Sequence, residues 1–127
     1  MADQLTIAVD FDGTCVTHEY PYLGQDIGAA PVLRELADAG YRLILNTMRS
    51  GKLEREAEDW FKRNNIPLWA VNCNPEQKKW TKSPKVYAEL YIDDSNLGIP
   101  LTTNEKSTRP YVDWVRVREL LVKEGYL

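Results

Sequence analysis

Two aspartates separated by one residue follow an apolar run near the start of the chain. The run, Leu5 to Val9, is long enough for one buried strand, and Asp10 and Asp12 come directly after it. Because side chains alternate along a strand, the two carboxylates start on the same side. Like charges held so close stay ionised only if a positive group lies between them, and a hard divalent cation such as Mg²⁺ meets that need with oxygen ligands. The pair therefore indicates a metal site at the end of a strand.

Polar side chains of matching chemistry end two other apolar runs. Residues 41–47 form a predicted strand that ends in Thr47, and residues 90–92 form another that is followed by Asp93 and Asp94. In parallel sheets, ligands bind beyond the carboxyl ends of the strands. We therefore expect these residues, distant in sequence, to converge in space with the first aspartate pair.

Strands alternate with helices along the whole chain, which favours a parallel sheet with both faces covered. The predicted strands are residues 5–9, 41–47, 68–71 and 90–92, and the predicted helices are residues 30–39, 51–64 with Ser50 as N-cap, and 110–123. Polar connections are expected over 72–83 and 101–109, and a short helix or turn over 84–89. In the last helix we expect these side chains to be buried: Val112, Val115, Leu120 and Leu121. The predicted fold is a three-layer Rossmann-like α/β domain.

Length and composition limit the options further. The chain has 127 residues, enough for one compact domain over residues 1–127. Its net charge of −3 gives no global basic field for nucleic acid, although a local patch remains an option. Two cysteines form neither a disulfide framework nor a metal-binding spacing, so a reducing, cytoplasmic location is the simpler inference. No apolar run approaches membrane-spanning length, so no membrane contact is expected.

The motif over residues 10–14, DFDGT, resembles the first signature of the haloacid dehalogenase (HAD) superfamily of phosphohydrolases. Residues 43–47 look like the second signature, Lys85 looks like the third, and the acidic pair within residues 91–94 looks like the fourth. The four elements come in family order. The chain is most similar to the small capless members of bacteria and their phages, which implies an HAD-like fold without a sizeable cap domain.

The resemblance implies a Mg²⁺-dependent phosphatase that acts through an aspartyl-phosphate. In this scheme Asp10 is the nucleophile and Asp12 is the general acid and base. The cation would be held by Asp10, Asp93 and the backbone carbonyl of Asp12, and Asp94 would bind the metal or orient its water. The presence of Asp12 favours phosphoryl transfer over carbon–halogen chemistry, because dehalogenases of the superfamily lack it.

Phosphate binding falls to other residues. The resemblance implies that Thr47 donates its hydroxyl to a phosphate oxygen and that Lys85 supplies positive charge, with Lys82 as the rival lysine. Arg49 follows Thr47 by two residues and is a candidate for a second phosphate or a substrate carboxylate. Its alternative role is an ion pair with the following helix.

The substrate stays open at this point. Residues 13–42 and 48–83 leave no room for a sizeable cap, so the site is expected to admit a phosphorylated small molecule, a nucleic-acid end or a phosphoprotein. A partner subunit in a homo-oligomer is another option for covering it. Residues 15–28 are expected to form a flap, where His18, Tyr20 and Tyr22 are either substrate contacts or ordinary loop residues.

Two other hypotheses accompany the phosphatase. The first is a catalytically weak HAD-like domain that keeps the metal site and binds a phosphorylated ligand or partner in a regulatory role. The second is a response-regulator receiver, which the order of the acidic motifs disfavours. The lysine-rich stretch over residues 78–82 is either a solvated loop or a surface for a phosphate-rich ligand, with Trp80 stacking on a base.

Overall fold

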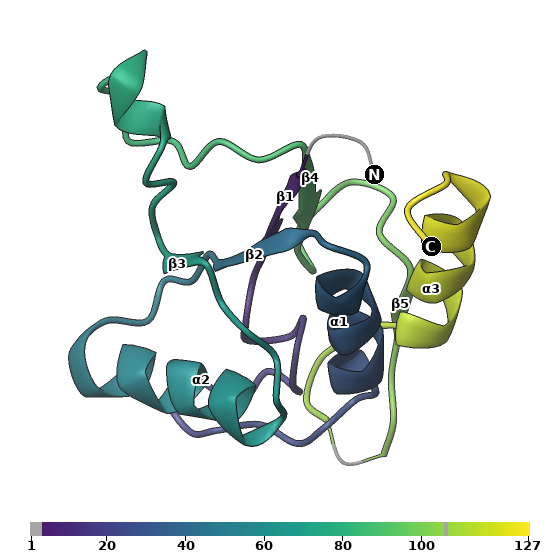
Figure 1. The fold of residues 1–127 in the computed structure, drawn as a ribbon. Coiled ribbons are helices and arrows are strands. Elements are labelled where there is room, and N and C mark those ends of the chain that lie inside the picture. Colours follow the sequence, from purple (N-terminus) through teal and green to yellow (C-terminus); the bar gives the residue numbers. More distant parts are fainter. Residues whose placement is uncertain (1–3, 106) are drawn as a thin grey trace.

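Four parallel strands form the sheet at the centre of the molecule (Figure 1). The computed structural model describes residues 4–105 and 107–127. In order across the sheet the strands are β3 (Ala70–Val71), β2 (Arg42–Leu45), β1 (Thr6–Val9) and β4 (Leu90–Ile92). Val9 of β1 lies opposite Leu45 on one side and Ile92 on the other, so the carboxyl ends of the three strands are level. The predicted α/β class and parallel sheet are confirmed.

Three helices pack on one face of this sheet: α1 (Ala29–Asp38), α2 (Gly51–Arg63) and α3 (Trp114–Lys123). All three contribute to one hydrophobic cluster with the strand residues that share a face, and its members include Ile7, Val9, Leu43, Leu45, Leu33, Leu36, Trp60, Phe61, Val117 and Leu121. The helices of the described chain lack the length and apolar character that a membrane crossing requires.

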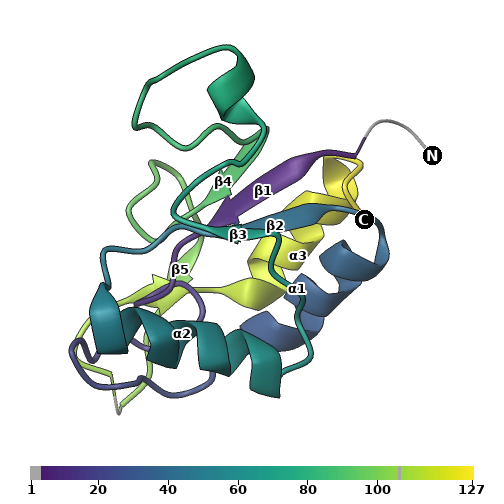
Figure 2. The ribbon, with the colours of Figure 1, turned by 60° about the vertical axis from the view of Figure 1, so that its left-hand side comes forward.

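The strand residues that alternate with this cluster, such as Ala8 and Ile44, are also buried but point to the other face of the sheet. There the connection from β3 to β4 is not a helix. It is the irregular segment 72–89, which contains one 3-10 turn, η1 (Gln77–Lys79), and extends away from the three helices in both views (Figures 1 and 2). The chain bends at residues 84–85, where a short helix or turn was expected.

The prediction that the last helix begins at Pro110 is wrong. A small antiparallel pair, β5 (Leu101–Thr102) with β6 (Tyr111–Val112), occupies the start of that segment and part of the expected polar connection. Helix α3 begins only after Asp113, whose carboxylate accepts hydrogen bonds from the backbone amides of the first turn. Pro110 and Asp113 are both helix-start signals, and strand pairing decides between them.

The buried face of α3 also differs from the predicted one. Trp114 and Val117 are buried, whereas Val115 is 75% exposed and Leu120 is 43% exposed. The expected burial of Val115 and Leu120 is therefore wrong. The expected burial of the other two residues is confirmed, as Val112 and Leu121 are both buried.

Candidate metal and phosphate site

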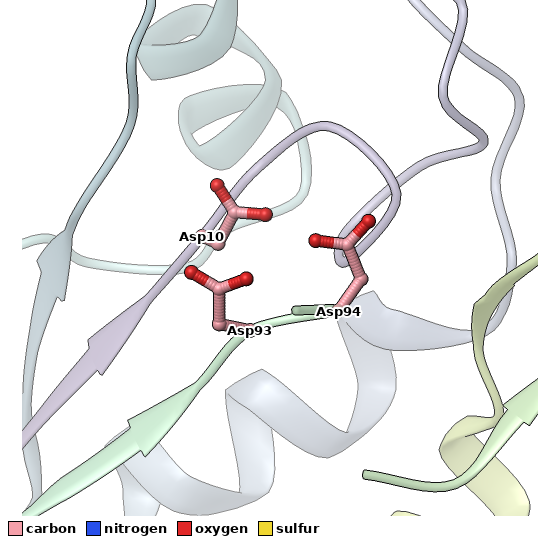
Figure 3. A group of neighbouring side chains, drawn as sticks. All are labelled: Asp10, Asp93 and Asp94. Atoms are coloured by element: carbon pink, nitrogen blue, oxygen red, sulfur yellow. The ribbon is translucent and has the colours of Figure 1, made fainter. Parts of the chain in front are cut away.

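Three carboxylates meet where β1 and β4 end. Asp10 and Asp93 follow neighbouring strands, and the amide of Asp10 donates to the carbonyl of Ile92 at 3.0 Å, which extends the ladder to the last residue before the acids. Asp10, Asp93 and Asp94 each offer an oxygen within 4.8 Å of the others (Figure 3). The predicted convergence of the first and fourth motifs is confirmed.

Thr14 links the two ends of this cluster. Its hydroxyl donates to the Asp10 carboxylate at 2.8 Å and accepts from the backbone amide of Asp94 at 2.9 Å. Because this hydroxyl is fully buried and used in both directions, it fixes Asp10 relative to the loop after β4. Thr14 is therefore a positioning residue. It belongs to the first motif, but no role was predicted for it.

The turn that carries Thr14 depends on a glycine. Gly13 has φ of +80°, and a Cβ placed there would lie 2.3 Å from the Asp94 carboxylate. Both the backbone conformation and the space therefore exclude a side chain. The turn is also held from far along the chain, since Val112 donates its amide to the Gly13 carbonyl at 2.9 Å and the Trp114 indole donates to the Thr14 carbonyl at 2.6 Å.

The negative charge gathered in this cluster favours binding of a cation. Burial, together with the charges of Asp93 and Asp94, raises the pKa of Asp10 to about 8. Burial and a hydrogen bond with Asp93 also raise the pKa of Asp94, although Arg109 lies 3.9 Å from it. Three carboxylate oxygens held this close together fit a hard divalent ion such as Mg²⁺, which would offset the repulsion between them.

Lys85 lies beside this cluster. It lines a recess of about 330 Å³ together with Asp10, Asp93 and Asn46, the residue that follows β2. Its ammonium also lies 5.7 Å from the centre of the Tyr91 ring. Lys82 lines a separate recess, so the arrangement favours Lys85 over Lys82 as the lysine of the site.

Asp12 is held by a buried arginine. The Arg49 guanidinium donates from Nε and Nη2 to the two carboxylate oxygens of Asp12, both at 2.8 Å. The Arg49 side chain is 0% exposed, and it also donates to the carbonyl of Tyr22 in the flap. Arg49 is therefore committed to Asp12, and the predicted binding of a substrate anion by Arg49 does not fit this geometry. The alternative also has support, since Glu56 of α2 lies 3.8 Å from Nη1.

Thr47 lies on the loop after β2, two residues beyond the last residue of the strand. Its amide donates to the Asn72 side chain at 2.7 Å, and its hydroxyl accepts from the amide of Arg49 at 3.1 Å. The hydroxyl proton can still be donated, so the predicted contact of Thr47 with a phosphate stays a prediction.

Some residues of the flap pack against the domain, and others are exposed to solvent. Val16 bridges Asp26 in antiparallel fashion, so the two ends of the expected flap lie side by side. Tyr20 and Tyr22 are 50% and 77% exposed, and the Arg49 guanidinium lies 5.5 Å from the Tyr20 ring. Their contact with substrate stays a prediction.

Several residues of the site carry no sequence signal of their own. Asn46 enters the recess because it follows a strand end, a position that the strand-end rule marks in general. Arg109 reaches Asp94 from a loop beyond β5, and nothing in its local sequence marks it.

Comparison with known proteins gives one informative likeness. A solved structure described as the conserved protein coded by a locus of Bacteroides thetaiotaomicron is 38% identical, with a TM-score of 0.76. The match covers 96% of this chain and 92% of that chain. No family model and no curated protein matches. The likeness bears on fold and family, because that description states no activity.

Proposed function

This chain belongs to the same family as the conserved protein of Bacteroides thetaiotaomicron, and we propose that it is a Mg²⁺-dependent phosphohydrolase of the HAD type. The observation that carries the proposal is the meeting of three carboxylates from two strand ends, with Lys85 in the same recess as Asp10. A cluster built only for stability would not bury Asp10 beside two further acids whose charges raise its pKa.

The metal site would consist of Asp10, Asp93 and Asp94, with the backbone carbonyl of Asp12 as a further ligand. When bound, the cation would offset the repulsion between a phosphate ester and the carboxylates and would polarise the phosphoryl oxygens. Thr14 keeps Asp10 and the Asp94 loop in place for this role.

The reaction then follows from the side chains. The Asp10 carboxylate attacks phosphorus, the bond to the ester oxygen breaks with its electron pair on that oxygen, and Asp12 donates the proton that the leaving alcohol needs. Asp12 next takes a proton from water, whose oxygen attacks phosphorus and releases inorganic phosphate and free Asp10. Lys85 and Thr47 bind the phosphate oxygens throughout.

Arg49 positions Asp12 in this scheme. The two hydrogen bonds fix the plane of the carboxylate, and each oxygen keeps a second lone pair for the leaving group or water. The same bonds also favour a second candidate function, the regulatory domain with weak turnover, because a proton on Asp12 would remove the charge that strengthens its pair with Arg49.

Hydrolysis of a panel of phosphate esters by the purified protein, with Mg²⁺ and with chelator, tests the proposal. We expect metal-dependent turnover that falls at least ~10³-fold in Asp10→Asn, because the nucleophile is lost. Asp38→Asn, at the exposed end of α1, is the matched control and should keep full activity. Turnover that survives in Asp10→Asn would contradict the mechanism.

Calorimetric titration with Mg²⁺ separates the two candidate functions. Metal binding without turnover on any ester would favour the regulatory domain, and absence of both would reject the metal site.

A reducing, cytoplasmic location agrees with Cys15 and Cys73, neither of which is in a disulfide.

A further inference from the structure

The segment 72–89, which we name the lysine arm, carries most of the exposed positive charge near the site. Lys78, Lys79, Lys82 and Lys85 are all exposed. The two acids of the arm are occupied elsewhere, since Glu76 pairs with Arg42 and Glu89 accepts from the amide of Thr6. Within the described residues, no carboxylate forms an ion pair with these lysines. The arm is thus a local basic surface on a chain of net charge −3.

The arm has a defined shape because two amide side chains are buried inside it. Gln77 donates to the carbonyls of Ser83 and Lys85, at 3.0 and 2.6 Å, and accepts from the amide of Tyr87 at 2.8 Å. Asn74 donates to the carbonyl of Tyr87 and accepts from the amides that open η1. These bonds close the arm on itself, so its lysines are presented by a fixed backbone.

Aromatic surface accompanies the charge. Trp80 is 65% exposed although it meets the edge of Tyr87, with ring centres 5.5 Å apart, and Tyr87 is itself 44% exposed. An indole left this open beside lysines offers the face on which unpaired nucleic-acid bases stack.

Two recesses are lined by residues of the arm, and one of them also contains Asp10 and Asp93. The first, of about 330 Å³, holds Asp10 and Lys85, and the second, of about 250 Å³, holds Lys78 and Lys82. Val86 lines both recesses. A ligand that placed one phosphate at Asp10 and continued along the arm would meet the lysines with its next anionic groups.

We propose that the lysine arm binds single-stranded nucleic acid and presents its phosphorylated end to Asp10. This inference rests on the proposed function and names its substrate class. A sugar phosphate would fill the first recess and leave the second unused. A phosphopeptide would bring one phosphate without the repeated charges and bases that Lys78, Lys82 and Trp80 would meet.

Binding of a fluorescent, end-phosphorylated single-stranded oligonucleotide to Asp10→Asn protein, measured by anisotropy, tests the inference without turnover. We expect Lys78→Gln with Lys82→Gln to weaken binding ~10-fold and to lower the salt slope by about 1.4, because each lost phosphate contact contributes about 0.7. Trp80→Ala should weaken binding by a similar ~10-fold.

The control pair is Lys62→Gln with Lys123→Gln, which removes the same charge from exposed positions at the ends of α2 and α3. Equal loss in both pairs, or no binding at all, would overturn the inference. So would a phosphopeptide of equal charge that binds as tightly as the oligonucleotide. Turnover of a small ester by the wild-type protein is measured separately, so failure of the arm and failure of the proposed function are distinguishable.

Discussion

The protein contains two arginine–carboxylate pairs of nearly identical geometry in different surroundings. Arg49 donates to Asp12 from Nε and Nη2 at 2.8 Å each, and Arg118 donates to Glu35 from the same atoms at 2.8 and 2.7 Å. The Arg49 and Asp12 side chains are 0% and 11% exposed, whereas those of Arg118 and Glu35 are 47% and 40% exposed. The first pair lies at the candidate site, and the second joins α3 to α1.

The acids of the two regions differ in the same way. Hydrogen bonding to Arg118 lowers the pKa of the exposed Glu35, whereas burial and two neighbouring acids raise the pKa of Asp10. Residue type and pairing geometry therefore do not decide how much a charged pair contributes to stability. Desolvation decides it, because water screens the outer pair and is excluded from the inner groups.

The largest expected effect comes from breaking the inner pair. Arg49→Met should lower the free energy of unfolding by about 3–5 kcal/mol, because it leaves Asp12 buried without its partner. Arg118→Met should change it far less, since both partners are exposed to solvent. Urea unfolding at neutral pH measures both, and equal losses in the two variants would show that burial does not set the contribution of the pair.

Two glycines with similar backbone conformations also differ in their surroundings. Gly13 and Gly125 have φ of +80° and +87°, but a Cβ on Gly125 meets no atom within 4 Å. Alanine at either position should cost about 1–2 kcal/mol of stability for the left-handed conformation. Only Gly13→Ala should also weaken Mg²⁺ binding, by at least ~10-fold, because its methyl group displaces Asp94. Calorimetry measures the affinity, and a loss in Gly125→Ala would contradict this account.

The smallest effect is a pH dependence of stability without metal. Because the folded-state pKa of Asp10 is raised from 3.8 to about 8, the folded protein holds a proton that the unfolded chain has released between these values. The stabilising contribution is therefore complete below pH 4 and is lost as the pH rises toward 8. Between pH 6 and 7, wild-type stability should fall by up to about 1.4 kcal/mol relative to Asp10→Asn.

Urea unfolding of both proteins in chelator measures this difference. Added Mg²⁺ should cancel the slope, since it favours the ionised acid. A slope of equal size in Asp10→Asn would assign the effect to another group.

The sequence predicted the parts of the molecule that follow from local pattern. Asp10 and Asp93 lie at one edge of the sheet because the carboxyl ends of parallel strands are aligned. Hydrophobic periodicity and residue type were enough to predict this. The role of Arg49 could not be predicted in this way. Arg49 and Arg118 are the same residue type, and burial of one of them results from packing between distant segments.

The remaining errors have similar causes. Pro110 and Asp113 are both valid helix starts, and pairing of β6 with β5, a contact absent from local sequence, selects the second. The shape of the lysine arm depends on buried Asn74 and Gln77, which have no periodic pattern. Side chains that hydrogen-bond to the backbone of an irregular loop can be identified only when the loop's folded structure is known.

The indole of Trp114 and the carbonyl of Thr14 join positions 100 residues apart. During synthesis at about 5–20 residues per second, this partner for the turn after Asp10 is absent for roughly 5–20 s after Thr14 is made. The amide of Val112, which holds Gly13, arrives almost as late. Until these residues have been made, the turn after Asp10 lacks both hydrogen bonds, so the candidate site is complete only after residue 114 has been made.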